Sequence, residues 1–229
     1  FGDMVTYMDK VIGQIVAKLE AEGLRENTLL MVTGDNGTNT GITSPWPTRG
    51  GNIDGGKGKM IDDGTHVAFV ASWPGTIKPG TVVESPIDFS DVFPTVVEAT
   101  GASLPDDLDG QSMVPLLKGD ESNARGWAFV DYSRSGAPPY RHFIRTPRYK
   151  LYSTGELYDV PNDWMEKNPL TSPETEGVRK KLQSAMDKVM QGHPTEEEIL
   201  KRLEGTRKMN SKAERAPNKD DKEKKHKRK

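Results

Sequence analysis

Cysteine is absent from all 229 residues of this sequence. The chain therefore contains no disulfide, no thiolate metal ligand and no cysteine nucleophile of its own. Long apolar runs are also missing, since no stretch approaches the roughly 18–20 residues that a membrane-spanning helix needs. The first residues, Phe1 to Met4, lack the basic start and apolar core of a signal peptide, and no initiator methionine stands at position 1. Because a helical pattern begins almost at once, we expect this chain to be part of a longer protein.

Hydrophobic residues are scarce as well, at 33% of the sequence with a mean hydropathy of −0.71. The shortfall is uneven, because residues 201–229 hold 13 Lys and Arg against 5 Asp and Glu. We expect 206–229 to be a charged, disordered tail, since it has too few apolar residues to pack. The basic run at 224–229 has no interleaved aromatics, and the net charge is −2, which argues against a nucleic-acid partner. A solubilising role or weak attachment to an anionic glycan fits this run better.

The first part of the chain has the pattern of a helix followed by a strand. Apolar residues recur at helical spacing through 3–22, which predicts a helix that Asp3 caps and Gly23 ends. A short loop then leads to a strand at 29–33. The polar, glycine-rich stretch that follows, 34–66, is a loop of the length that compact domains use for function or leave disordered.

A second apolar run at 67–72 predicts a buried strand, and a second helix is expected from about Ser90 to Gly101. Helix, strand, long polar loop and strand in this order are typical of an α/β sheet. From Trp127 onward, short aromatic segments broken by turns predict a small antiparallel sheet, with strands within 127–132, 142–146, 149–152 and 156–159. Apolar residues at helical spacing in 174–190 predict a terminal helix. The chain thus divides into an α/β part, a small subdomain and a tail, at 1–122, 123–191 and 192–229.

Two oxygen-bearing side chains, Asp35 and Asn36, come directly after the strand at 29–33. Asp-Asn-Gly is a common turn sequence, so the pair needs no ligand to explain it. The alternative is a hard-cation site, since Ca²⁺ takes about six to eight oxygen ligands and these side chains supply two of them. Their spacing alone leaves both interpretations open.

Lys57 stands between glycines in the string GGKGK, residues 55–59. Glycine lets the backbone approach a ligand closely, and a lysine ammonium is a compact charge suited to an anionic oxygen. A nucleotide P-loop is disfavoured, because Gly58 stands where a Ser or Thr should bind Mg²⁺. The simpler interpretation is a flexible surface loop with a solvated lysine. His66 precedes the second strand, where a histidine is more often a structural hydrogen-bonder than a catalyst.

Taken in order, these motifs resemble the C-terminal half of the sulfatase family, in the alkaline-phosphatase-like superfamily. The segments that carry the resemblance include TGDNGT and GGKGK and lie within 4–38, 55–83, 88–119 and 140–163. The likeness covers about 3–190 and implies part of an α/β sheet flanked by helices. It also implies a small C-terminal subdomain in which a helix packs on a four-stranded antiparallel sheet.

The resemblance implies roles for four residues. Asp35 and Asn36 would be ligands of one Ca²⁺ ion, whose remaining ligands would come from a preceding part of the protein. Lys57 would contact the substrate sulfate. His66 stands where many arylsulfatases have arginine, within the variant Asp-x-Gly-Thr-His of bacterial-type members, and is a candidate catalytic residue.

The family's nucleophile has no counterpart in this sequence. It is a formylglycine made from Cys or Ser in C/S-x-P-x-R, whereas the nearest string, 45–49, has proline at the nucleophile position. The family's paired aspartates and its upstream Lys and His residues would lie before Phe1. The resemblance therefore implies hydrolysis of sulfate esters by a longer, periplasmic or secreted protein, and we expect no turnover by these 229 residues alone.

Two other functions remain open at this point. A phosphodiesterase or phosphonate hydrolase of the same superfamily uses similar loops, usually with two metals, and a non-catalytic binding domain would keep the fold alone. For a sulfatase, the substrate would be a sulfated small molecule or carbohydrate. Arg141, His142 and the loop 133–140 are candidates for its selectivity.

Overall fold

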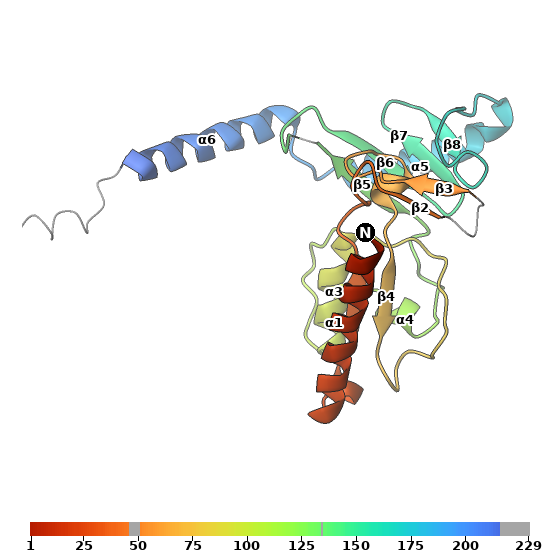
Figure 1. Cartoon of the computed structure of the whole chain (residues 1–229). Helices are drawn as coiled ribbons and strands as arrows, with labels where there is room; N and C mark the ends of the chain where they lie inside the picture. The colour runs from red at the N-terminus through yellow and green to blue at the C-terminus, as the bar shows by residue number, and fades with distance from the viewer. Residues whose placement is uncertain (46–50, 134, 216–229) are drawn as a thin grey trace, which may run out of the picture.

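The computed structural model describes residues 1–45, 51–133 and 135–215 (Figure 1). Most of the string 45–49 and the basic run 224–229 therefore lie outside the described residues. The helices are α1 (Gly2–Ala21), α2 (Asp62–Thr65), α3 (Val92–Ala99), α4 (Val114–Leu117), α5 (Glu176–Met190) and α6 (Glu196–Arg215). The strands are β1 (Leu30–Thr33), β2 (Thr43–Pro45), β3 (Asn52–Asp54), β4 (Phe69–Ser72), β5 (Ala128–Tyr132), β6 (Arg141–Arg145), β7 (Tyr149–Tyr152) and β8 (Leu157–Asp159).

Helix α1 forms where its apolar spacing predicts. It ends before Gly23, whose φ of +68° is the left-handed conformation that commonly follows a helix. The expected cap at Asp3 is wrong, because the helix begins at Gly2 with Phe1 in the capping position and no side-chain cap. Asp3 instead lies in the first turn, where a carboxylate interacts favourably with the positive end of the helix dipole.

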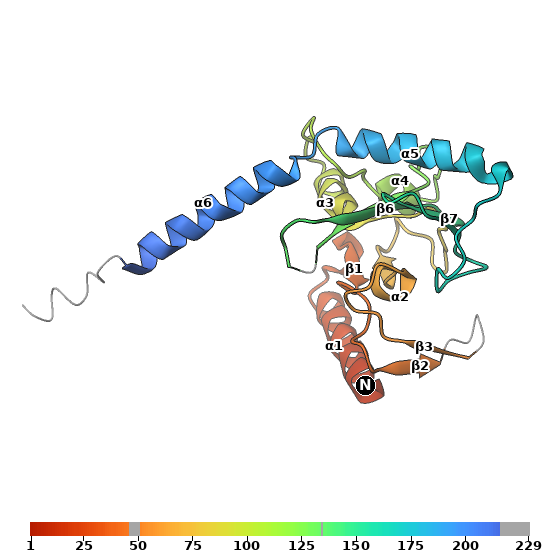
Figure 2. The ribbon, with the colours of Figure 1, turned by 90° about the horizontal axis from the view of Figure 1, so that it is seen from above.

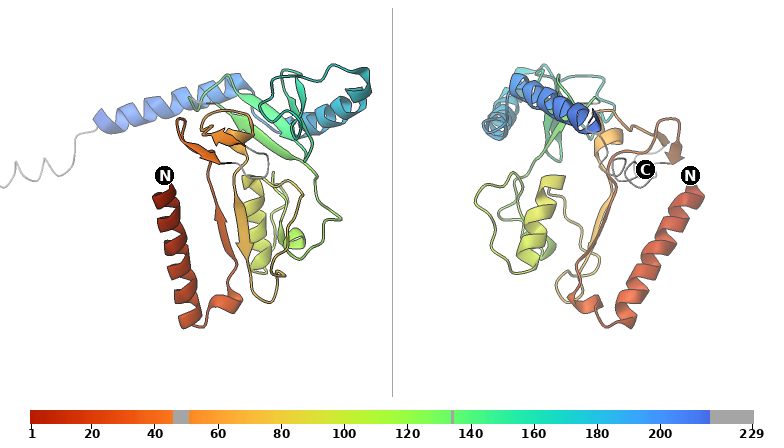
Figure 3. Two further views of the ribbon diagram at one scale, coloured as in Figure 1. Left: turned by 45° about the vertical axis from the view of Figure 1, so that its right-hand side comes forward. Right: turned by 90° about the vertical axis from the view of Figure 1, so that its left-hand side faces the viewer.

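Strands β1 and β4 form a two-stranded antiparallel ladder, with Leu30 opposite Ser72. Helices α1 and α3 lie on opposite sides of this ladder (Figure 3). The expectation of a buried strand at 67–72 is wrong, since no residue of β4 is buried and Val70 is 62% exposed. A strand becomes buried when it has neighbours on both edges and helices on both faces. Here one strand pairs with one other, so the ladder is only part of the implied α/β sheet.

The apolar stripe of α1 is only partly covered. None of its residues is buried, and Met4 and Met8 are 72% and 52% exposed, whereas Val11, Ile12, Val16 and Leu19 are half-buried. An amphipathic helix normally takes most of its stability from packing that stripe against another element. In the described part of the chain, the first two turns of this stripe face solvent.

The helix expected from about Ser90 to Gly101 is α3, preceded by a 3-10 turn. Asp91 at its start is buried, accepts a hydrogen bond from the backbone N–H of Gln111 at 2.7 Å, and pairs with Arg125 at 2.6 Å. Burial raises the pKa of Asp91, although these donors act in the opposite direction. These contacts fasten the start of α3 to the segment that leads into β5.

The small antiparallel sheet predicted from the aromatic segments is confirmed, with strand order β5-β6-β7-β8. Helix α5 lies along one face of the sheet and α2 lies on its other side (Figure 2). The core between the sheet and α5 consists of Ile144, Leu151, Leu157, Leu182 and Met186. A second buried cluster on the opposite face joins Met60 to Phe143 and Tyr152. The main core of the chain therefore belongs to this sheet, and the loop before α2 packs directly against it.

The prediction of a disordered tail from 206 is wrong for 206–215, which continue α6 (Figure 1). Local contacts explain why a segment with few apolar residues is helical. Thr195 and Glu198 exchange hydrogen bonds of 2.8 Å and 3.3 Å in a capping arrangement, and Lys201 pairs with Glu197 at 2.8 Å. The remainder of the predicted tail, 216–229, lies outside the described residues.

Candidate functional site

Three segments of residues 34–66 meet below the four-stranded sheet, and they contain all four candidate residues. The backbone N–H of Gly37 donates to the carbonyl oxygen of Gly64 at 2.9 Å. The backbone N–H of Lys57 donates to the carbonyl oxygen of Thr38, also at 2.9 Å. The loop after β1 is thus bonded both to the lysine loop and to α2.

The glycines of these segments are required by contacts within the chain itself. A Cβ atom at Gly37 would lie 1.9 Å from the carbonyl oxygen of Asp63, and one at Gly55 would lie 2.0 Å from that of Asn39. At Gly56 a Cβ atom would meet the side chain of Asp63 at 2.2 Å. Real Cβ atoms do not approach other atoms so closely. The interpretation that Gly55 and Gly56 leave room for a ligand is therefore replaced by close packing of one backbone segment on another.

Asp35 and Asn36 lie side by side at the end of β1, with Asp35 exposed. The Asn36 amide nitrogen donates to an Asp35 carboxylate oxygen at 2.6 Å. A carboxylate and a carboxamide oxygen suit a hard cation such as Ca²⁺, and a half-turn of the amide would present its oxygen. Within the described ranges, no group of three or more His, Asp or Glu side chains could hold a metal ion. The pair thus fits Ca²⁺ as two ligands and does not complete its shell.

Lys57 and His66 both expose their side chains. Within the described part of the chain, no carboxylate lies within ion-pair distance of Lys57, so its ammonium is available to an external anion. The His66 side chain is 74% exposed, and its Nδ1 lies 3.8 Å from the Asp62 carboxylate, beyond hydrogen-bond range. The structural interpretation of His66 as a hydrogen-bonder is therefore wrong. The imidazole can reach a ligand at the end of α2.

Asp62, next to these loops, is buried and paired with the four-stranded sheet, which the sequence did not indicate. Its carboxylate accepts hydrogen bonds from Arg145 at 3.0 and 3.3 Å and lies 3.7 Å from the Lys150 ammonium. Burial acts to raise the pKa of Asp62, but the bonds and charge of Arg145, with Lys150, prevail and lower it below its ordinary value. Asp62 thus remains an anion that anchors α2 to the sheet.

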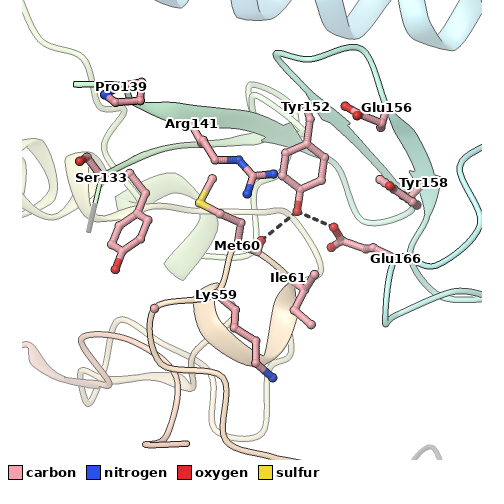
Figure 4. Close-up of a pocket in the computed structure, with 12 residues that line it drawn as sticks. Lys59, Met60, Ile61, Ser133, Pro139, Arg141, Tyr152, Glu156, Tyr158 and Glu166 are labelled. Atoms are coloured by element: carbon pink, nitrogen blue, oxygen red, sulfur yellow. Dashed lines mark hydrogen bonds between the residues drawn. The ribbon is translucent and has the colours of Figure 1, made fainter. Parts of the chain in front are cut away.

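Lys150 has the most unusual environment in this part of the chain, since its side chain is fully buried. Its ammonium donates to the carbonyl oxygen of Met60 at 2.5 Å and to the Glu166 carboxylate at 2.7 Å. The Tyr152 hydroxyl bridges the same two groups, at 3.2 Å from Met60 and 2.5 Å from Glu166 (Figure 4). The ammonium also lies 4.0 Å from the centre of the Phe143 ring. Two residues of β7 thus hold the loop that follows Lys57.

Burial shifts the titration of this cluster. It lowers the pKa of Lys150 and raises the pKa of Glu166, while each partner's charge acts to keep the other ionised. Burial and the Glu166 carboxylate both raise the pKa of Tyr152, which stays a hydrogen-bond donor. The only signal in the sequence is strand alternation, which places Lys150 and Tyr152 on one face of β7 with Leu151 on the other.

A cavity of about 510 Å³ opens between this cluster and the loop at 58–61 (Figure 4). Its walls include Arg141 and Ser133, so part of the predicted selectivity surface lines a pocket. His142 does not, because successive strand residues point to opposite faces. Its ring lies 5.8 Å from Phe129, which packs against the core under α5. His142 therefore does not line this cavity, and its role in selectivity stays a prediction.

Two family models match this chain. One, described as sulfatase, matches residues 1–102, and the other, described as the C-terminal part of N-sulphoglucosamine sulphohydrolase, matches residues 56–192, more than half of the chain. The chain belongs to the sulfatase family. Relatives of this sulfatase chain include rat (Rattus norvegicus) steryl-sulfatase, 31% identical with 84% of this chain and 40% of the relative covered. An ulvan-active sulfatase of Formosa agariphila is 28% identical, with 73% and 38% covered.

Solved structures give the same fold. A protein in complex with its substrate, D-glucosamine-2-N,6-O-disulfate, matches with a TM-score of 0.65 at 24% identity, covering 81% of this chain and 38% of the other. The phosphonate monoester hydrolase of Agrobacterium radiobacter matches with a TM-score of 0.64 at 25% identity, covering 81% and 39%. The sulfatase chain described here spans about 40% of the length of its curated relatives. Within its described ranges, no helix is long and apolar enough to cross a membrane.

The bonds between Asp62 and Arg145, which anchor α2 of this sulfatase chain to the sheet, predict that the free energy of unfolding depends on pH. The folded-state pKa of Asp62 lies below its ordinary value of 3.8. The stabilisation from Asp62 is therefore fully present above about pH 4 and is lost as the pH falls through the folded pKa. In urea unfolding, we expect the stability difference between the wild type and Asp62→Asn to be largest near neutral pH and to shrink below about pH 4.

Asp106→Asn is the matched control, because Asp106 is exposed and has no partner in the anchor. It should change the free energy of unfolding by less than about 0.5 kcal/mol at each pH. An Asp62→Asn difference that is equal at about pH 3 and about pH 7 would contradict the assignment.

Proposed function

We propose that this chain supplies part of the active site of a sulfate-ester hydrolase. In this proposal Lys57 contacts the sulfate group, and Asp35 and Asn36 supply two oxygen ligands of a Ca²⁺ ion. One observation carries it: the loop of Asp35 and Asn36 and the loop of Lys57 are bonded backbone to backbone, through Thr38. Two segments that the family resemblance assigns to metal and sulfate thus lie next to each other in a chain that belongs to that family, which supports the proposal.

The proposed chemistry divides between this chain and groups outside it. Bound Ca²⁺ would lower the cost of ionising the nucleophile and neutralise charge on the sulfate oxygens. The Lys57 ammonium would balance the negative charge that builds up on the sulfuryl group in the transition state. His66, exposed at the end of α2, is the candidate to donate a proton to the leaving alcohol.

The nucleophile is proposed to come from polypeptide outside these 229 residues, since the sequence has no cysteine and no C/S-x-P-x-R string. The proposed substrate is a sulfated small molecule or carbohydrate, in keeping with a relative named an ulvan-active sulfatase. A periplasmic or secreted location would give access to such substrates.

The test compares Lys57→Ala with Lys118→Ala in a protein that joins this chain to a formylglycine-bearing segment. Lys118 is an exposed lysine at the end of α4 and serves as the control. With an aryl sulfate as substrate, Lys57→Ala should lower kcat by about 100-fold or more, and Lys118→Ala should leave it unchanged. The 229-residue chain alone should show no turnover. Robust hydrolysis by the chain alone, abolished by Lys57→Ala, would refute the proposal that the nucleophile comes from outside these 229 residues.

A second function is favoured by the likeness to a phosphonate monoester hydrolase, at a TM-score of 0.64. The same loops would then hold a phosphonate ester in place of a sulfate ester. An aryl phosphonate monoester, assayed beside the aryl sulfate, separates the two activities. Metal analysis separates them further, because the two-metal chemistry of phosphoryl transfer needs a second ion.

A further inference from the structure

The cavity beside the Lys150 cluster has the size and lining of a ligand site. Its volume of about 510 Å³ lies within the range of about 300–1,000 Å³ that small-molecule sites occupy. The loop at 58–61 forms one wall and the strands of the small sheet form the other. In Figure 4 the Lys59 side chain extends away from the space between these walls, in keeping with its 2.9 Å ion pair to Asp63. Arg141 is the other cation in the lining.

Arg141 differs from the other arginines of the small sheet. Arg145 pairs with Asp62 at 3.0 Å, and Arg148 pairs with Asp159 at 2.8 Å. Among the described residues, no carboxylate lies within 4.0 Å of the Arg141 guanidinium, which lies 5.9 Å from the centre of the Tyr152 ring. A guanidinium presents two parallel N–H donors, which match the oxygens of a carboxylate or sulfate. Arg141 is thus exposed and has no ion-pair partner among the described residues, which leaves its N–H donors available to an anion.

The carboxylates that line the cavity are already engaged. Glu166 is held by Lys150 and Tyr152, and Glu156 accepts a hydrogen bond from Thr154. The Thr154 bond, together with the backbone and, more weakly, Arg141, keeps the pKa of Glu156 below its ordinary value. The pocket therefore contains acidic groups but leaves a strong donor for a negatively charged ligand.

Three tyrosines complete the lining, Tyr132, Tyr152 and Tyr158. The buried Tyr152 ring meets the half-buried Tyr158 ring edge to face at 6.0 Å and 89°. The Tyr132 hydroxyl lies 3.5 Å from where a Cβ of Gly58 would stand. Because Gly58 directly follows Lys57, a ligand in this pocket would lie beside the proposed sulfate contact.

We propose that this pocket binds the sugar ring that carries the sulfate ester, and that Arg141 binds a second anionic substituent on the substrate. The substrate class is thus a carbohydrate with at least two negative groups, the sulfate ester and a carboxylate or further sulfate. Tyr132 and Tyr158, which are half-buried, supply ring faces and hydroxyl groups for the sugar, and Arg141 selects for charge. This inference rests on the proposed function, because it takes the position of Lys57 as the position of the ester.

The test measures binding to the 229-residue chain by NMR titration with three probes: D-glucosamine 6-sulfate, D-glucosamine-2-N,6-O-disulfate and a sulfated uronate-hexosamine disaccharide. At least one probe with two negative groups should bind about tenfold more tightly than the monosulfate, which is the effect of one strong charge-assisted contact. Arg141→Gln should remove that preference, and Arg141→Lys should retain part of it. Arg202→Gln, at an exposed arginine of α6, is the matched control and should retain all of it.

The outcomes separate this inference from the proposed function. No preference for the doubly charged probes, or a preference that survives Arg141→Gln, overturns the pocket assignment, whatever Lys57→Ala does to hydrolysis. A preference that Arg141→Gln removes supports the pocket even if the aryl sulfate assay fails. The same spectra show whether the Arg141 variants are folded, so loss of binding through unfolding is recognised directly.

Discussion

Replacing Lys150 by methionine is expected to destabilise the chain by about 3–5 kcal/mol, because it leaves the buried Glu166 carboxylate without its cation. Lys150 is completely buried, 2.7 Å from Glu166 and 3.7 Å from Asp62. Methionine keeps most of the side-chain volume, so the effect reports the lost charge and hydrogen bonds and not a cavity. The carbonyl of Met60 would lose one of its two donors at the same time. Urea unfolding of the two proteins measures the difference.

Two controls make this result specific. Lys180→Met removes an exposed lysine whose pair with Glu176 spans 3.8 Å, and it should change stability by less than about 0.5 kcal/mol. The double variant Lys150→Met with Glu166→Gln should lose less than the sum of the two single variants, because it removes the charge left unpaired. If Lys150→Met is as stable as Lys180→Met, the buried pair does not hold the loop.

Gly37→Ala is expected to disrupt the contact between the loop of Asp35 and Asn36 and α2. The added Cβ would lie 1.9 Å from the carbonyl oxygen of Asp63 and 2.7 Å from the Cα of Gly64. Both are backbone atoms, so no side chain can move aside, and the loops must separate. Overpacking of this kind lowers the free energy of unfolding by about 1–3 kcal/mol, and we expect a value near the upper end because the neighbouring backbone is rigid. Hydrogen exchange should also show faster exchange of the Gly37 amide, which bonds to Gly64 in the wild type.

Gly13→Ala is the matched control within the same chain. Gly13 lies inside α1, and a Cβ there meets no atom within 4 Å. Alanine in the interior of a helix is favoured over glycine by about 0.5–1 kcal/mol, so this variant should be slightly more stable. The steric account of Gly37 would be falsified if Gly37→Ala and Gly13→Ala had the same effect on stability.

Much of the fold follows from local sequence patterns, and the small sheet shows why. Each of its strands is an aromatic segment bounded by turn residues, and the connections between β6, β7 and β8 are short. Short hairpins make pairing partners local, so the order of strands could be predicted without distant information. The terminal helix was predicted for the same reason, since Leu182 and Met186 lie on one periodic face and are buried.

The contacts that hold α2 and the loop before it on the small sheet join segments about 80 to 90 residues apart, which no local pattern reveals. Arg145 bonds Asp62 across 83 residues, and Lys150 bonds Met60 across 90. A lysine within a strand is expected to face solvent, because lysines are almost never fully buried unless paired. The burial of Lys150 could be predicted only with its partners in place. For Asp35, Asn36, Lys57 and His66 the sequence indicated positions and a family, and their proposed roles remain predictions.

Side chains of β7 alternate between the two faces of the sheet, so the pairing register of this strand decides which of them reach the loop after Lys57. Lys150 and Tyr152 both donate to one oxygen, that of Met60, while Leu151 between them is fully buried in the opposite core. A slip of one residue in pairing would turn an ammonium into the hydrocarbon layer and an isobutyl group toward the loop. The loop that carries Lys57 is therefore held on the sheet only when β7 pairs in its native register, because only that register places both donors at the Met60 carbonyl oxygen.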